Sequence, residues 1–465
     1  YDYFSVPQPD APQAESSQHQ DLASDLGRAV ASLSLYVEAC KLFFILAPLV
    51  SHGDGNIVSY TTWRERGWCR LERCARQMSS ASSMLLVKRP DTVIEIGAQD
   101  YLLDPVGKGC FSVEADRKNL SPIVEGLLTH KLKQLVAEQR YEECNLLLSW
   151  CVPLLDGLQD ASWKAMIRRS LSGADAPEAC EEAAWRAVLP LDAAASRTWG
   201  WQPLLVASGI GDTAMLEDLI SGRADVAAAG TRERPTYLVN ARQQPLHIAA
   251  TRGHTAAISV LLRHCADVNA KDGTRQTALA MSASSGRCDA VRCLLEQRAE
   301  VNVRSGGGSS PLDLSVIFGR LDVAELLIAA RADLTGCPSG ITPLHNCGIF
   351  QVGHAVTQAV INARANLHAR LIPKFGTKTW VTVTAMNLRF RSGKRSFLTR
   401  LAHHMSGSTP LMLAVMFDLF VEASLMLQAG SPLDARNNRG ADVRELAEVF
   451  GVSEVVRSLL REPRP

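Results

Sequence analysis

A repeat with a period near 33 residues most constrains what this chain can fold into. From Gln244 the chain reads QPLHIAATRGHTAAISVLLRHCADVN, and related segments begin 33 and 66 residues later, at Thr277 and Ser310. Repeats of roughly 20 to 50 residues are typical of solenoids, in which neighbouring units bury a core that no unit buries alone. Weaker copies complete a predicted set of seven units, and they begin at Gln202, Thr342, Thr409 and Asp442.

Each unit is predicted to form two short helices. Thr or Ser before Pro is typical of a helix N-cap followed by proline at the first helical position, where its missing N–H is not needed. Gly253 suits the left-handed residue that ends the first helix. In the second helix Ile258, Leu261 and Leu262 are expected to form the buried stripe.

These units, with TPLH at their start and a 33-residue period, resemble ankyrin repeats over about residues 202–465. The resemblance implies an all-α solenoid over 198–465 that binds a protein partner. Contacts are expected from turn residues whose side chains stacking does not require; the other interpretation is that these residues only keep the turns soluble. The residues are Lys271, Asp272, Arg275, Arg304, Asn437, Asn438 and Arg439.

Residues 370–404 interrupt the repeats and carry no ankyrin signature. This basic insertion contains eight Lys or Arg, two His and no Asp or Glu. One interpretation is a basic hairpin that contacts an anionic partner, such as a phosphate-bearing chain, with Trp380, Phe390 and Phe397 available for stacking. The other is a solvated insertion, because blocks of like charge are usually solvated.

The segment 1–118 is predicted to be an α/β domain with a parallel sheet, beginning with a strand that ends near Phe4. A helix is expected over residues 22–37, a strand buried on both faces over 42–46, a helix over 68–78 and a strand over 84–87. Residues 119–197 are expected to form a helical connector to the repeats. Because the chain starts at Tyr1 in the middle of such a domain, we expect further sequence upstream.

The string W-C-x-x-E at Trp68, Cys69 and Glu72 resembles the motif of TIR domains. The chain is also similar to the related heterokaryon-incompatibility domain, through Asp2, Ser5, Val6, Gln8, Tyr36 and Ala39, with Ser5 replacing the family's cysteine. The TIR resemblance implies a partial domain in which Glu72 supports cleavage of the nicotinamide glycosidic bond of NAD, with Trp68 and Cys69 at the nucleotide. The alternatives are core packing for Trp68 and Cys69, and an ion pair of Glu72 with Arg66, Arg70 or Arg73.

Composition narrows the remaining function classes. The 49 Lys and Arg nearly balance the 48 Asp and Glu, which argues against a general nucleic-acid binder. The twelve cysteines lack metal-binding spacing, so we expect no metal and reduced thiols in the cytoplasm. No apolar run is long enough for a membrane span. We therefore expect a protein-binding scaffold without a cofactor, with an NAD-cleaving or nucleotide-sensing TIR-like protein as the alternative.

Overall fold

The chain forms two compact units, one of residues 1–48 and 62–190 and one of residues 49–61 and 191–465. The computed structural model describes the following residues: 37, 40, 43–47, 50–51, 57–58, 60–79, 84–89, 92–96, 100–111, 116–158, 203–230, 239–337, 340–372, 378–393 and 396–461. The predicted strand near Phe4 lies outside the described residues, and so does the predicted helix over 22–37 except for Val37, which is helical.

The first unit contains a small mixed sheet with strand order β1-β4-β5. Strands β1 (Phe44–Leu46) and β4 (Met84–Arg89) are parallel, and α3 (Gly67–Met78) lies between them in the sequence, so this strand, helix and strand follow the predicted order. Strand β5 (Thr92–Ile96) returns antiparallel to β4. The prediction of a parallel sheet is therefore wrong for this edge, because only two residues separate β4 from β5 in the sequence, too few for the crossover that a parallel pair needs.

Strand β1 is buried on only one face. Ile45 is 2% exposed, whereas its neighbours Phe44 and Leu46 are 50% and 72% exposed. The prediction of a strand buried on both faces is wrong because an apolar run carries no alternation from which a covered and an open face could be distinguished.

Helices make up most of the remaining described residues of the first unit. Helix α5 (Asp116–Ala137) packs against α3 and against α6 (Tyr141–Leu155). Their contact faces contain Leu120, Leu128 and Trp150, none of which is exposed. The shorter elements are α2 (Tyr60–Glu65), α4 (Asp100–Leu103) and a 3-10 turn, η2 (Val106–Lys108).

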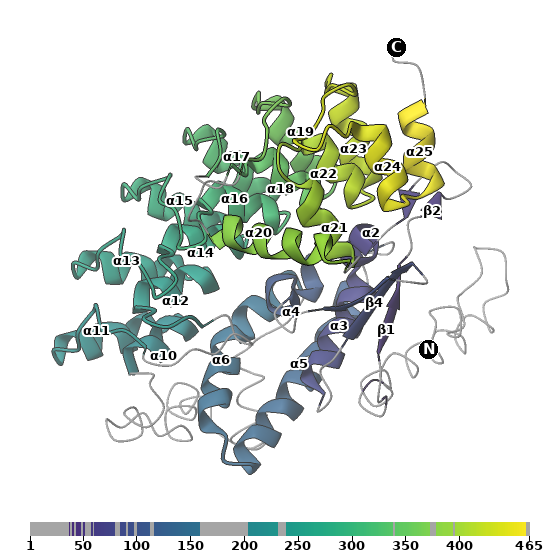
Figure 1. Ribbon diagram of the computed structural model, residues 1–465. Coiled ribbons are helices and arrows are strands. Elements are labelled where there is room, and N and C mark those ends of the chain that lie inside the picture. Colours follow the sequence, from purple (N-terminus) through teal and green to yellow (C-terminus); the bar gives the residue numbers. More distant parts are fainter. Residues whose placement is uncertain are drawn as a thin grey trace, which may run out of the picture. The chain divides into compact units, whose positions relative to one another are not determined.

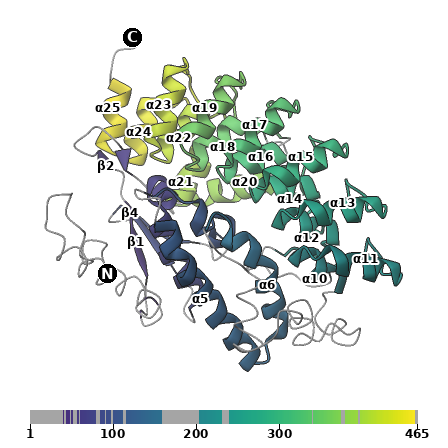
Figure 2. The same ribbon diagram turned by 180° about the vertical axis from the view of Figure 1, so that it is seen from behind.

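The second unit is a stack of helix pairs, with one pair at each predicted repeat. The first helices pack in series and the second helices do the same, so two parallel rows share one continuous core (Figures 1 and 2). The pairs are α10 (Pro203–Ile210) and α11 (Thr213–Ser221), α12 (Pro245–Arg252) and α13 (Thr255–Arg263), α14 (Ala278–Ser284) and α15 (Cys288–Glu296), α16 (Pro311–Ile317) and α17 (Leu321–Ala329), α18 (Pro343–Ile349) and α19 (His354–Asn362), α22 (Pro410–Met416) and α23 (Phe420–Gln428), and α24 (Val443–Phe450) and α25 (Glu454–Arg461). A short antiparallel pair, β2 (Val50–Ser51) with β3 (Ile57–Val58), also belongs to this unit.

The helix boundaries follow the predicted local signals. The side chains of Ser310, Thr342 and Thr409 cap the first helices of their units, each with proline at the next position. Gly253 ends α12 with φ +85°, in the left-handed region. In α13 Ile258 and Leu261 are fully buried as expected, whereas Leu262 is only half-buried.

In the two units that carry it, the histidine of the TPLH motif holds the first helix to the turn that follows the unit. At His345 the backbone N–H of Thr342 donates to Nδ1, so Nε2 carries the proton and donates to the carbonyl of Ser408, 3.3 Å away. His247 makes the equivalent pair of bonds with Gln244 and Ala270. Burial lowers the pKa of His345 to about 4 and also lowers the pKa of His247, so both rings are neutral at pH 7.

Candidate partner-binding surface

The turns between consecutive helix pairs, which we call fingers, share one hydrogen-bonding pattern. In each finger without an insertion, a backbone hydrogen bond between residues four apart closes the turn. These bonds run from the N–H of Asp272, Ser305, Cys337 and Asn437 to the carbonyls of Gln276, Ser309, Ile341 and Ala441, at 2.8–2.9 Å. The bond therefore defines the turn of each of these fingers, with described tip residues at 273–275, 306–308 and 438–440.

Neighbouring fingers are also bonded to one another. The N–H of Gly273 donates to the carbonyl of Ala241 at 2.7 Å, and the N–H of Gly306 donates to that of Thr274 at 2.8 Å. A Cβ added to Gly273 would lie 2.7 Å from the same Ala241 oxygen, so glycine permits this close approach. The backbone bonds set the spacing of the row and hold adjacent tips in register.

Two of the predicted contact residues are internal supports of their fingers. Asp272 is 4% exposed, and its carboxylate accepts from the backbone N–H groups of Thr274 and Gln276 and from the side chain of Asn240. Asn437 is also 4% exposed; its Oδ1 accepts from the N–H groups of Arg439 and Ala441. The expectation that their side chains project to the surface is corrected, because the turn backbone uses their oxygens.

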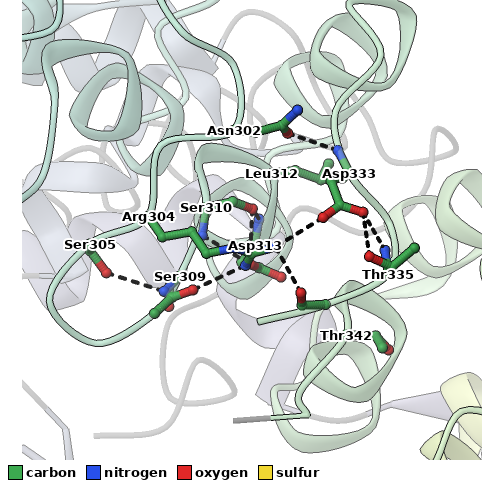
Figure 3. A network of polar contacts seen from close by, with 12 residues as sticks. Asn302, Arg304, Ser305, Ser309, Ser310, Leu312, Asp313, Asp333, Thr335 and Thr342 are labelled. Carbon is green, nitrogen blue, oxygen red and sulfur yellow. Dashed lines mark hydrogen bonds and ion pairs between the residues drawn. The ribbon is translucent and has the colours of Figure 1, made fainter. Parts of the chain in front are cut away.

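Arg304 is a cross-link between two fingers rather than an exposed contact residue. Its guanidinium donates to the carbonyls of Gly308, in its own finger, and Gly336, in the next, at 3.1 and 2.8 Å. It also forms ion pairs with Asp313 at 3.4 Å and Asp333 at 3.2 Å (Figure 3). These four contacts occupy the side chain, so the sequence-based expectation is corrected here too.

The two carboxylates beside Arg304 differ in environment. Asp313 is 3% exposed and completes a capping box with Ser310; burial raises the pKa of its carboxyl despite that bond. The pKa of Asp333 is lowered, first by the hydrogen bonds from the hydroxyl and N–H of Thr335. Arg304 thus compensates a buried acid as well as joining two fingers.

The other four predicted contact residues do lie at the surface. Lys271 and Arg275 are exposed on the finger that Asp272 supports, Arg275 within its tip and Lys271 directly before its closing bond. Asn438 and Arg439 are exposed at the last finger, where Asn438 donates to the hydroxyl of Ser406 at 2.8 Å and Arg439 donates to the carbonyl of His403 at 3.2 Å. Lys271 and Arg275 are consequently the clearest positions for a partner.

The basic insertion is an enlarged tip of one finger. The closing bond of this finger runs from the N–H of Leu371 to the carbonyl of Ser408 at 2.9 Å. The N–H of Gly407 donates back to the carbonyl of Leu371 at 2.7 Å, and we call this pair of bonds the neck of the insertion. Helix α18 packs directly against α22, so the solenoid continues as if the insertion were absent. The composition of the segment marks it in the sequence, but a bond between residues 37 apart has no local signal and could not be predicted.

Between the two sides of the neck the chain forms two helices, α20 (Lys378–Arg391) and α21 (Phe397–His404), which pack against each other. The predicted stacking role is corrected for Phe390, which is buried, whereas Phe397 remains 38% exposed. Phe390 is buried and stacked on His403 with centroids 4.4 Å apart, and Phe397 packs edge-on against Phe417 and Phe450. The side chain of Trp380 lies outside the described residues.

The TIR-like residues lie on α3 in the first unit. Cys69 is buried, and burial raises its thiol pKa to about 12, so it is a neutral core residue. Trp68 and Glu72 are half-buried. The buried guanidinium of Arg73 on the same helix pairs with Asp104 at 3.1 Å, and Asp104 also binds Arg64 at 2.7 Å. Across the described residues, no group of three His, Cys, Asp or Glu side chains has a geometry that could hold a metal ion.

The comparisons with known proteins identify the repeats. A family model described as ankyrin repeats (3 copies) matches residues 204–305 and 246–336. No curated protein matches the chain. Among solved structures, the ankyrin repeat domain of Bcl-3, described as a unique member of the IkappaB protein family, is 19% identical over 57% of this chain and 99% of that chain, with a TM-score of 0.42.

The C-terminal half of the chain therefore contains ankyrin repeats, while none of these findings identifies the N-terminal unit. Within the described part of the chain, no helix is both long and apolar enough to cross a membrane.

Proposed function

We propose that this protein is an interaction scaffold whose ankyrin fingers bind a protein partner. Ankyrin repeats typically mediate protein–protein interaction. The observation that supports this function here is the separation of roles within a finger: Asp272 holds the turn from inside, while Arg275 in the tip and Lys271 beside it remain exposed. A surface ordered in this way loses little conformational entropy when a partner binds.

The exposed cations suggest that the partner carries acidic groups where it meets this finger. Charged tips accelerate encounter and discriminate between partners more than they add affinity. We also propose the cytoplasm as the site of this interaction. Cys144, Cys151 and Cys347, for example, are free, buried thiols, as expected in a reducing compartment.

The test is quantitative capture of proteins by immobilised full-length chain, comparing the wild type with Lys271→Glu/Arg275→Glu. A matched control is Arg292→Glu/Arg298→Glu, which makes the same charge change at exposed positions in the middle of α15 and two residues beyond its end. We expect specific partners to be retained by the wild type and the control and depleted at least tenfold by the tip variant. Capture profiles that do not differ between the three proteins would refute the proposal.

A further inference from the structure

Helix α20 of the basic insertion exposes a second apolar face. Its inner face packs on α21, through the stacked pair of Phe390 and His403 and a hydrogen bond between Asn387 Oδ1 and His403 Nδ1 at 2.9 Å. On the outer face, Val381, Ala385 and Leu388 follow the i, i+4, i+7 spacing of one helical stripe, and Val381 and Leu388 are 54% and 62% exposed. A helix that is apolar on both sides is normally covered on both.

Apolar exposure is concentrated in this insertion. The described residues expose ten large apolar side chains, and five of them fall between residues 370 and 404 although this segment is a small part of the chain. They are Ile372, Val381, Leu388, Phe397 and Leu398. Isolated exposed apolar residues need no explanation, but a concentration on one small module indicates a contact surface.

The charge around the stripe is of one sign. Arg389 and Arg391 are exposed on α20, and at 100° per residue they fall on opposite sides of the stripe. The 35-residue insertion holds eight Lys or Arg and no acid, whereas acids outnumber Lys and Arg in the rest of the chain. An anionic surface is therefore the electrostatic complement of the stripe and its surroundings.

The module is held in a defined position on the last repeats. Arg400 of α21 donates to the carbonyl of Val449 at 2.9 Å, and Asn437 donates to the carbonyl of His404 at 2.9 Å. The ring of Phe397 lies 5.8 Å from that of Phe450 in α24. The outward face of α20 is thus presented by a packed helical hairpin, and the exposed stripe does not contribute to its folding.

We propose that the outer face of α20 binds the surface of an anionic lipid bilayer. The aliphatic side chains of Val381 and Leu388 enter the headgroup boundary, and the flanking arginines extend to lipid phosphates and carboxylates. A nucleic-acid strand is disfavoured because the outer face of α20 carries the aliphatic side chains of Val381 and Leu388, which offer bases no aromatic ring to stack on. An acidic protein segment is disfavoured for a different reason. A surface that carries only positive charge offers no alternation of charges that would fix the register of a bound segment, whereas a fluid lipid surface needs no fixed register.

The experiment is co-sedimentation of the full-length protein with vesicles, at near-physiological salt. Vesicles of phosphatidylcholine with about 30 mol% phosphatidylserine, which gives a clear negative surface potential, are compared with vesicles of phosphatidylcholine alone. We expect the protein to sediment with the anionic vesicles and to remain in the supernatant with the neutral ones. Raising the salt should release it, because the attraction is screened over a Debye length.

Two variants test the two halves of the surface separately. Val381→Ser/Leu388→Ser removes the stripe, and Arg389→Glu/Arg391→Glu reverses its flanking charge; each should weaken vesicle binding about tenfold. All four positions are exposed, so circular dichroism and the melting temperature should match the wild type. The control Arg292→Glu/Arg298→Glu changes the same charge on the solenoid and should bind vesicles like the wild type.

Three results would overturn the proposal: wild type that stays in the supernatant with anionic vesicles, equal binding to neutral vesicles, or variants that bind as well as the wild type. A fluorescent poly-glutamate peptide is the parallel probe. Wild type that binds this peptide but not the anionic vesicles would assign the face to an acidic protein instead. None of these results depends on whether the finger tips bind a partner, so the proposed function is tested independently.

Discussion

His345 donates from Nε2 to the carbonyl of Ser408, a residue 63 positions further along the chain. In the unit that contains His247 the corresponding bond reaches only to Ala270. The same contact is therefore preserved across the basic insertion, together with the closing bond between Leu371 and Ser408. The insertion lengthens one finger tip without changing the stacking of the repeats on either side.

The first prediction follows from this neck. Replacing residues 372–407 by a three-residue tip, as in the finger after Asp272, should leave a folded solenoid. The loss should be about 1–3 kcal/mol of unfolding free energy, because Phe417 and Phe450 lose their edge contacts with Phe397. Urea unfolding measures it, and Phe397→Ala in the full chain should reproduce most of the loss. Unfolding of the last two units on replacement would show that the insertion is part of the core.

The second prediction concerns pH. The folded-state pKa of His345 is lowered from 6.5 to about 4 by burial, so its contribution to stability is complete above pH 6.5 and is lost as pH falls toward 4. One such group changes the unfolding free energy by about 1.4 kcal/mol per pH unit in that window. His254, whose pKa burial also lowers to about 4, acts in the same direction.

Unfolding free energies at pH 7 and pH 5 test this. His345→Gln should reduce stability at pH 7 but shrink the difference between the two pH values by about 2 kcal/mol, since it removes one titrating group. His368→Gln, at an exposed histidine, is the matched control and should leave the difference unchanged. An unaltered difference in His345→Gln would contradict the assignment.

The third prediction separates supporting from presenting residues in the fingers. Arg304→Met should cost about 1–3 kcal/mol, because it leaves the buried Asp313 without its cation and the carbonyls of Gly308 and Gly336 without their donor. Arg275→Met, at an exposed tip, should change stability by no more than about 0.5 kcal/mol. Equal effects in urea unfolding would mean that Arg304 does not join the two fingers.

The fourth prediction concerns the N-terminal unit. Asp104→Ala should destabilise this unit by about 3–5 kcal/mol, because the guanidinium of Arg73 is fully buried and loses its carboxylate. Glu72→Ala, at a half-buried position, should cost less. Thermal melts compare the two, and an NAD-consumption assay on wild type and Glu72→Ala tests the enzymatic alternative. NAD turnover that Glu72→Ala abolishes would establish that alternative.

The repeats were predictable because their signals are local. Ser310 and Thr342 before proline and Gly253 in a left-handed turn each specify a helix end within four residues. The burial of Asp272 and Asn437 was not predictable, because polar residues in a turn look exposed until their bonds to the turn backbone are known. The antiparallel return of β5 and the neck at Leu371 depend on pairing between separate segments, which no local pattern encodes.

The most direct test of the scaffold claim is the affinity of a captured, purified partner for three proteins, measured by calorimetry. They are the wild type, Lys271→Glu/Arg275→Glu, and the chain in which residues 372–407 are replaced by a short tip. We expect at least tenfold weaker binding for the tip variant, which corresponds to about 1.4 kcal/mol or more. The chain without the insertion should bind like the wild type. Undiminished binding by the tip variant, with binding lost when the insertion is replaced, would contradict the account.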